Sequence, residues 1–166
     1  MGRSIRFWKT FVKAGLVKPR GRVVRFSLDT SCLVALLAEW HPFHRASVAA
    51  YEGRLEQGER LVLAGHAVLE CFSVLTRLPA PMSAAPQIVE QALSSYLSTG
   101  TELAGMTPET CRQALRDLAG RGLGGGRIYD AIIALCSYQA GATILLTWNL
   151  KHFLSVAPVG LAVQEP

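Results

Sequence analysis

Hydrophobic residues recur along most of this chain in short blocks of two kinds. Short continuous apolar runs are typical of strands buried on both faces of a sheet. Longer blocks carry apolar residues at helical spacing, and one of them ends at Gly141, a residue type that favours helix ends. The predicted strands cover 22–29, 60–64, 101–106, 143–147 and 159–163, and the predicted helices cover 32–37, 41–57, 66–78, 88–97, 108–119 and 128–140.

The alternation of strands and helices predicts an α/β fold with a largely parallel sheet, because parallel strands need helical crossovers that cover both sheet faces. We expect about five strands, mostly parallel, with helices on both faces. A chain of 166 residues can build one complete core but hardly two. The sequence therefore predicts a single domain over 22–166, preceded by an extension over 1–21.

Composition supports a folded domain and shows an uneven charge. Half of the residues are hydrophobic and 17% are charged, which excludes a disordered chain. Residues 1–25 hold eight Lys and Arg and no acid, whereas the other 141 hold nine basic and twelve acidic residues. The basic extension can bind nucleic acid or an anionic surface. It can equally be solvated, or lie upstream of the true start codon, and the sequence leaves these alternatives open.

The compartment is predicted from what the sequence lacks. No apolar stretch approaches the roughly 20 residues that cross a bilayer, and no secretory signal follows the basic start. The cysteines form no Cys-x-x-Cys pair and fall mostly in apolar helical patterns, so we interpret them as core residues and not as disulfide or zinc ligands. These are Cys32, Cys71, Cys111 and Cys136. We expect a protein of the reducing cytoplasm.

Four polar residues are candidates for chemistry because of their places in this pattern. Ligands of parallel α/β sheets bind beyond the carboxyl ends of the strands. Asp29 ends the first predicted strand, and Asn149 follows the strand over 143–147 by two residues. Glu70 and Asp130 fall in the first turns of helices and are flanked by apolar residues. A carboxylate in apolar surroundings costs free energy unless a partner accompanies it.

Each acid also has a purely structural explanation. Asp29 can be an ordinary N-cap, Glu70 can pair with Arg77, and Asp130 can complement the dipole of its helix. A metal site explains all three together, because Mg²⁺ prefers hard oxygen ligands and three carboxylates repel one another without a cation. We therefore predict a metal site formed by Asp29, Glu70 and Asp130.

Other chemistries match the sequence poorly. The glycines at 124–126 are not followed by Gly-Lys-Ser/Thr, as a phosphate-binding loop would be. The histidines lack His-Glu-x-x-His spacing, and no Gly-x-Ser-x-Gly elbow is present. An aspartyl-nucleophile phosphatase would place a second aspartate where this chain has Ser31.

With these residues in place, the chain resembles the PIN-domain ribonucleases, and among them the VapC-type toxins of type II toxin–antitoxin pairs. The resemblance covers about residues 23–163, and four motifs occur in the family's order and spacing. They are Ser27-Leu-Asp29-Thr-Ser31, Ala67-Val-Leu-Glu70, Ile128-Tyr-Asp130-Ala-Ile-Ile-Ala134 and Leu146-Thr-Trp-Asn149-Leu-Lys-His-Phe153.

The resemblance implies a PIN domain that hydrolyses RNA phosphodiester bonds with Mg²⁺ or Mn²⁺. Asp29, Glu70 and Asp130 then carry over as catalytic, metal-binding acids. Asn149 is the fourth catalytic position, where many relatives have an acid and others have asparagine, so one metal ion is expected and a second is doubtful. The hydroxyl residues that would orient the acids or a water are Thr30, Ser31 and Thr147.

The resemblance also implies an RNA substrate, a cognate antitoxin whose C-terminal segment covers the pocket, and a homodimer. From the residues, Arg121, Arg127 and Lys151 are candidates for RNA phosphate contacts, with solvated surface charge as the alternative. Two other functions stay open: a PIN-fold nuclease of RNA maturation or decay, or one that acts on DNA, and a non-catalytic PIN module that binds RNA or protein.

Overall fold

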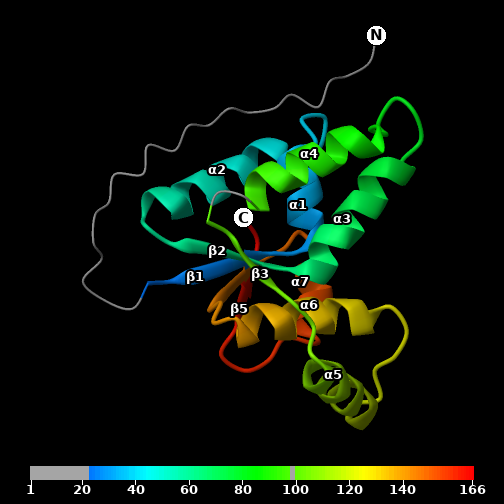
Figure 1. Cartoon of the computed structure of the whole chain (residues 1–166). Coiled ribbons are helices and arrows are strands. Elements are labelled where there is room, and N and C mark those ends of the chain that lie inside the picture. Colours follow the sequence, from blue (N-terminus) through cyan, green and yellow to red (C-terminus); the bar gives the residue numbers. More distant parts are fainter. Residues whose placement is uncertain (1–22, 98–99) are drawn as a thin grey trace.

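The computed structural model describes residues 23–97 and 100–166, and within them a five-stranded sheet forms the centre of the molecule (Figure 1). The strands are β1 (Arg25–Leu28), β2 (Arg60–Ala64), β3 (Glu102–Ala104), β4 (Ile144–Leu146) and β5 (Ala162–Gln164). Their order is β3-β2-β1-β4-β5, and each adjacent pair is parallel. The predicted parallel sheet is confirmed. β2 and β3 lie on one side of β1, and β4 and β5 lie on the other, so the strand order switches between β1 and β4. Ligands of such sheets bind at this switch point.

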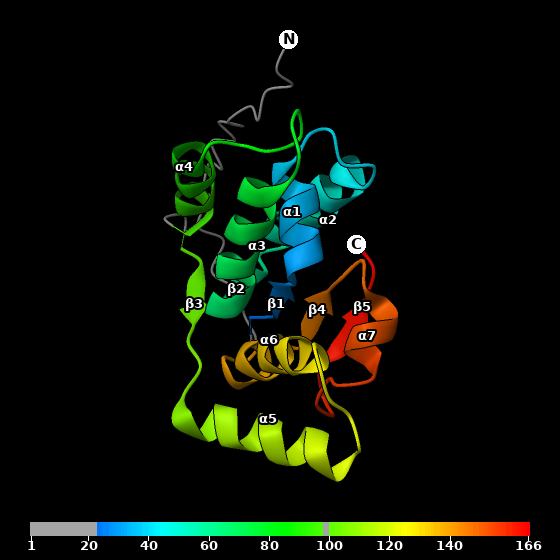
Figure 2. The ribbon, with the colours of Figure 1, turned by 90° about the vertical axis from the view of Figure 1, so that its right-hand side faces the viewer.

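Two helical layers enclose the sheet (Figure 2). Helices α1 to α4 cover one face, and α6 and α7 cover the other, with α5 packed outside α6. Their bounds are α1 (Thr30–Leu37), α2 (His44–Glu56), α3 (Gly65–Arg77), α4 (Pro86–Leu97), α5 (Pro108–Gly120), α6 (Arg127–Gln139) and α7 (Leu150–Leu154). This arrangement confirms the predicted α/β class with helices on both faces.

The core lies on both sides of the three inner strands, β2, β1 and β4. Phe26 of β1, Leu63 of β2 and Leu145 of β4 are completely or almost completely buried, as are Leu33 of α1 and Ile133 of α6. Each such side chain stabilises the fold by about 1.5–3 kcal/mol relative to exposure. The central strands read as continuous apolar runs because both of their faces are covered.

The cysteines belong to this packing, as predicted. All four are free; Cys32, Cys71 and Cys136 are buried, and Cys111 is half-buried. Burial raises the pKa of the Cys71 thiol to about 12. The three buried thiols, whose pKa values burial raises, are therefore protonated packing groups at neutral pH.

A few boundaries differ from the predicted ones. The first helix begins at Thr30 and not at residue 32, because Asp29 already acts as its N-cap. The second helix begins at His44, after the turn that contains Pro42. Helix α7 was not predicted, because five residues are too few to show a period. The extension over 1–21 lies outside the described residues.

No helix in the described part of the chain combines the length and the apolar character needed to cross a membrane.

Candidate active site at the carboxyl edge of the sheet

Asp29 lies at the carboxyl end of β1, where the strand turns directly into α1. Its side chain is 2% exposed, and its Oδ1 accepts a hydrogen bond from the Cys32 backbone N–H at 2.9 Å, which caps α1. The Ser31 hydroxyl donates to both carboxylate oxygens, at 2.8 and 2.9 Å, and the Thr147 hydroxyl donates to Oδ2 at 2.8 Å. Asp29 is thus an N-cap, but it is also held by Thr147, the residue that follows β4 and is far along the chain.

Burial sets the acidity of Asp29. Desolvation raises the pKa of its carboxyl above the ordinary 3.8, and hydrogen bonds from Cys32, Ser31 and Thr147 oppose that rise. The neighbours therefore stabilise the carboxylate without fully compensating for the loss of water. A cation beside this carboxylate would supply the missing compensation.

Glu70 projects from the second turn of α3 and is half-buried. Its Oε2 accepts a hydrogen bond from the Thr30 hydroxyl at 2.5 Å, across the contact between α1 and α3. Within the described residues Glu70 forms no ion pair with Arg77, so that structural explanation is wrong.

Asp130 lies in the first turn of α6, and its side chain is 20% exposed. Its Oδ2 is 3.7 Å from Nδ1 of His152 on α7. Burial raises the pKa of Asp130, the charge of His152 opposes this, and the charges of Asp29 and Glu70 raise the pKa further. The three acids, from three separate elements, therefore act on one another electrostatically.

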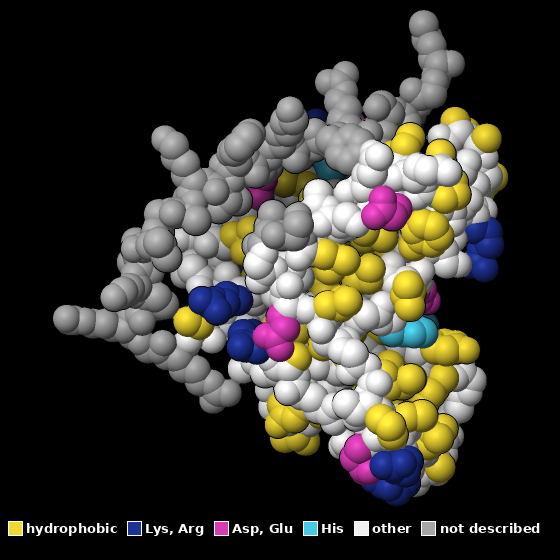
Figure 3. Space-filling model, in the orientation of Figure 1, with side chains coloured by type: hydrophobic (Ala, Val, Ile, Leu, Met, Phe, Trp, Pro, Cys, Tyr) yellow, Lys and Arg dark blue, Asp and Glu magenta, His cyan; other side chains and the backbone are white. Residues whose placement is uncertain are grey.

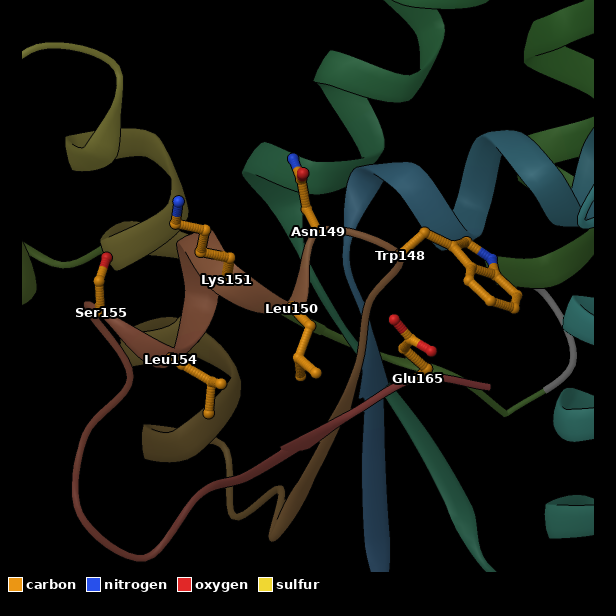
Figure 4. A pocket seen from close by; sticks show the side chains of 7 residues that line it. All are labelled: Trp148, Asn149, Leu150, Lys151, Leu154, Ser155 and Glu165. Atoms are coloured by element: carbon orange, nitrogen blue, oxygen red, sulfur yellow. The ribbon is translucent and has the colours of Figure 1, made fainter.

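Asn149 follows β4 and is exposed, at the N-cap of α7. The backbone fixes its place, because its N–H donates to the Thr147 hydroxyl at 2.8 Å, and the N–H of Trp148 donates to the Ser31 hydroxyl at 2.9 Å. The Asn149 side chain makes no capping hydrogen bond. In Figure 4 it points in the opposite direction from Leu150 and Leu154.

The three predicted phosphate-binding cations are all exposed, but they differ in their contacts. Arg127 is exposed at the first position of α6, close enough to Asp130 to lower its pKa. Arg121 is exposed but donates a hydrogen bond to the Ser155 carbonyl. Lys151 is exposed beside an open pocket between α7 and β5 (Figure 4). That pocket is lined by Trp148, Asn149, Leu150, Lys151, Leu154, Ser155 and Glu165.

The acids suit a divalent cation in chemistry and charge. They provide hard carboxylate oxygens, which Mg²⁺ and Mn²⁺ prefer, and their mutual repulsion disfavours the site without a cation. They do not form a finished cage: across residues 23–97 and 100–166, no three His, Cys, Asp or Glu side chains are grouped closely enough to hold a metal ion. The residues fit a Mg²⁺ ion that keeps several waters, which needs few direct protein ligands.

Three neighbours of the acids were not singled out as site residues by the sequence. His152 reaches Asp130 from α7, and only the recognition of that short helix would have placed it there. His66 of α3 and Tyr129 of α6 stack in parallel, with ring centroids 5.1 Å apart and 5° between planes. In the sequence, His66 lies one helical turn before Glu70, and Tyr129 directly precedes Asp130.

Comparison with known proteins places this geometry in a family. The model of the PIN-domain family matches residues 27–157. Ribonuclease VapC40 of Mycobacterium tuberculosis is 40% identical over 125 residues, which are 74% of this chain and 85% of the relative. Ribonuclease VapC27 of the same organism is 34% identical over 118 residues, 71% of this chain and 80% of the relative.

Solved structures share the fold at low sequence identity. VapBC2 of Rickettsia felis, bound to a DNA fragment of its promoter, aligns with a TM-score of 0.63 and 18% identity, covering 86% of this chain and 99% of that one. The sarcin–ricin-loop-cleaving toxin VapC20 of Mycobacterium tuberculosis aligns with a TM-score of 0.61 and 16% identity, covering 80% and 96%. The sequence matches and this fold show that the chain belongs to the PIN-domain family and, within it, to the VapC ribonucleases.

Proposed function

We propose that this protein is a divalent-metal-dependent endoribonuclease that acts as the toxin of a toxin–antitoxin pair, with Asp29, Glu70 and Asp130 as its metal-binding acids. The observation that carries the proposal is that hydrogen bonds hold the acids at the carboxyl edge of the sheet. The Thr147 hydroxyl, just after β4, donates to Asp29 at the end of β1, and the Thr30 hydroxyl, next to Asp29, donates to Glu70. The charges of Asp29 and Glu70 also raise the pKa of Asp130. A structural role for each acid separately does not require them to meet.

The metal is proposed to be Mg²⁺, or Mn²⁺, which share a preference for oxygen ligands. A bound ion of this kind lowers the pKa of a coordinated water and neutralises charge on the scissile phosphate. One ion is proposed, because Asn149 offers a neutral amide where a fourth carboxylate would be needed to balance a second cation.

The chain's own residues prepare this site. Ser31 and Thr147 donate to Asp29, and Thr30 donates to Glu70, so the orienting hydroxyls fix the direction of each carboxylate before substrate arrives. Arg127 and Lys151 are exposed beside Asp130 and Asn149 and are proposed to contact phosphates on either side of the cleaved bond. Arg121 can join them with the guanidinium N–H groups that Ser155 leaves free.

We propose RNA as the substrate and a cognate antitoxin as the partner, whose C-terminal segment covers the acidic edge, with two copies of this chain forming a homodimer. The Rickettsia felis relative was solved as VapBC2 on promoter DNA, and the Mycobacterium tuberculosis VapC20 toxin cleaves the sarcin–ricin loop. The proposed domain spans 22–166, with 1–21 as a basic extension.

The test is RNA cleavage by the purified full-length protein with and without Mg²⁺ or Mn²⁺. Wild type should cut RNA only with metal, and Asp29→Ala and Asp130→Ala should each lower the rate by more than about 100-fold, since transition-state charge stabilisation by a metal amounts to several kcal/mol. Asp117→Ala, which removes an exposed acid of α5, is the matched control and should cut normally. Full cleavage in EDTA, or by either acid variant, would refute the proposal.

A further inference from the structure

Phe43, in the turn before α2, places a large aromatic side chain where a capping residue is usual, with its ring stacked on Trp148 and 5.7 Å from the ring of His41. It occupies the N-cap position of α2 and makes no side-chain capping hydrogen bond, although this position favours Ser, Thr, Asp or Asn. Its side chain is 45% exposed. A phenylalanine here leaves the helix end uncapped and a large aromatic surface in water, so its presence calls for a function.

The ring of Phe43 is held in a defined orientation by Trp148. The two rings are stacked, with centroids 4.1 Å apart and 13° between planes. Trp148 is half-buried, and its indole N–H donates to the buried Ser47 hydroxyl at 2.9 Å. Trp148 therefore forms a fixed backing, and Phe43 is the exposed layer of a two-ring platform.

Hydrogen bonds connect the platform to Asp29 at the acidic edge. The backbone N–H of Trp148 donates to the Ser31 hydroxyl, which itself donates to the Asp29 carboxylate. Asn149 is the next residue along the chain. Hydrogen bonds thus fix Trp148 relative to Asp29, and Phe43 is stacked on Trp148, so the platform has a defined place beside the acidic edge.

We propose that Phe43, backed by Trp148, is the stacking site for an unpaired base of the RNA substrate, flanking the nucleotide at which the chain is cut. This inference rests on the proposed ribonuclease function. Single-stranded RNA is bound mainly through bases stacked on aromatic rings, with cations at the phosphates. Exposed Arg45 lies two residues beyond Phe43 and supplies such a charge, whereas the acids nearby would repel an unbound phosphate backbone.

The variants Phe43→Leu and Phe43→Trp test whether the group that binds on Phe43 is a base or an apolar protein side chain. Leucine keeps an apolar surface but has no ring face, and tryptophan keeps the face. With an RNA that the wild type cuts, Phe43→Leu should raise KM roughly tenfold, the effect of losing one stacked base, and leave kcat within about twofold, because this contact binds ground and transition states alike. Phe43→Trp should stay close to wild type. The control is Leu115→Ala, which shortens an exposed apolar side chain of α5 and should change neither KM nor kcat.

A second measurement changes the RNA, and its first part uses the unaltered protein, so that part does not depend on a variant that folds. The same RNA is prepared with an abasic site at each position near the cut. An abasic site at one position should raise the wild-type KM roughly tenfold. The KM of Phe43→Leu should not rise further with that RNA, since the two changes remove the same contact.

The outcomes distinguish this inference from the function beneath it. If wild type cuts RNA but no abasic position and no Phe43 variant changes KM, the stacking site is refuted and the ribonuclease stands. If Phe43→Leu keeps its KM but loses antitoxin binding, the platform is a protein-docking surface and the inference is again refuted. If wild type cuts no RNA, both proposals fail.

Discussion

At the scale of single residues, Asp29 combines two roles whose physical demands conflict. As an N-cap it needs only an acceptor, which a neutral amide supplies equally well. As a proposed metal ligand it needs a negative charge, yet it is 2% exposed and burial raises its pKa. Without a cation, the folded protein is therefore destabilised by the same charge that the proposed chemistry requires.

This conflict predicts that Asp29→Asn stabilises the protein while abolishing cleavage. Because the folded-state pKa of Asp29 is raised above 3.8, the folded state keeps the proton to higher pH, and stability falls as pH rises from the unfolded to the folded pKa. In EDTA at pH 7 the variant should gain on the order of 1 kcal/mol in free energy of unfolding. The gain should disappear well below the unfolded pKa. Urea denaturation at both pH values measures it.

Asp29→Ala is the matched control, since it removes the charge and the cap together. Loss of the capping acceptor costs about 1 kcal/mol, so the alanine variant should be less stable than the asparagine variant by about that amount. A wild type more stable than Asp29→Asn in EDTA at pH 7 would mean that the hydrogen bonds of the carboxylate outweigh its burial.

The places of the acids in the fold could be predicted from the sequence, whereas the residues they contact could be predicted only in part. Asp29 follows an apolar strand directly, so its place at the carboxyl edge depends on a local pattern. The contact between Asp130 and His152 joins α6 to α7, and the stack of Phe43 on Trp148 joins residues far apart in the chain. No local period encodes such contacts, because they arise from how elements pack together.

At the scale of elements, the start of α6 determines where Asp130 lies, and a glycine-rich turn determines the start of α6. Gly125 has a φ of +65°, in the left-handed region, and its carbonyl accepts from the Ile128 N–H at 3.3 Å. Gly124 lies next to it without a positive φ, and a Cβ would meet nothing within 4 Å at either position. Backbone conformation alone therefore distinguishes these two glycines.

Gly125→Ala should destabilise the protein by about 1–2 kcal/mol, the cost of a side chain in the left-handed region, and should lower cleavage through displacement of Asp130. Gly124→Ala should be neutral or slightly stabilising, because it only reduces the freedom of the unfolded chain. Urea denaturation and RNA cleavage on both variants measure this. Equal stabilities would show that the turn adapts and does not fix α6.

The elements were predicted where a local apolar pattern marks them, and five residues are enough for a strand but not for a helix. Strand β2 was predicted residue for residue, because Arg60 is followed by four consecutive apolar residues and then by Gly65. Helix α7 was missed because LKHFL spans little more than one turn, and its formation depends on tertiary contacts. Phe153, its buried residue, supplies such a contact.

At the scale of the whole molecule, most of the domain carries the same sign of charge as the proposed RNA ligand. Residues 26–166 hold twelve acidic and nine basic residues, so most of the domain repels a polyanion, and attraction depends on the few cations at the acidic edge or on the extension. The extension over 1–21 holds six basic residues: Arg3, Arg6, Lys9, Lys13, Lys18 and Arg20.

Deletion of residues 1–21 should leave the free energy of unfolding unchanged, because the sheet and its two helical layers are complete within the described residues. If the extension binds RNA, the slope of log affinity against log salt should become less steep, by at most about 4 if all six cations contact phosphates of a single strand. Fluorescence anisotropy with labelled RNA at several salt concentrations measures the slope, and urea denaturation measures stability. A lower unfolding midpoint would assign the extension to the folded domain, and an unchanged slope would leave RNA binding to Arg45, Arg121, Arg127 and Lys151.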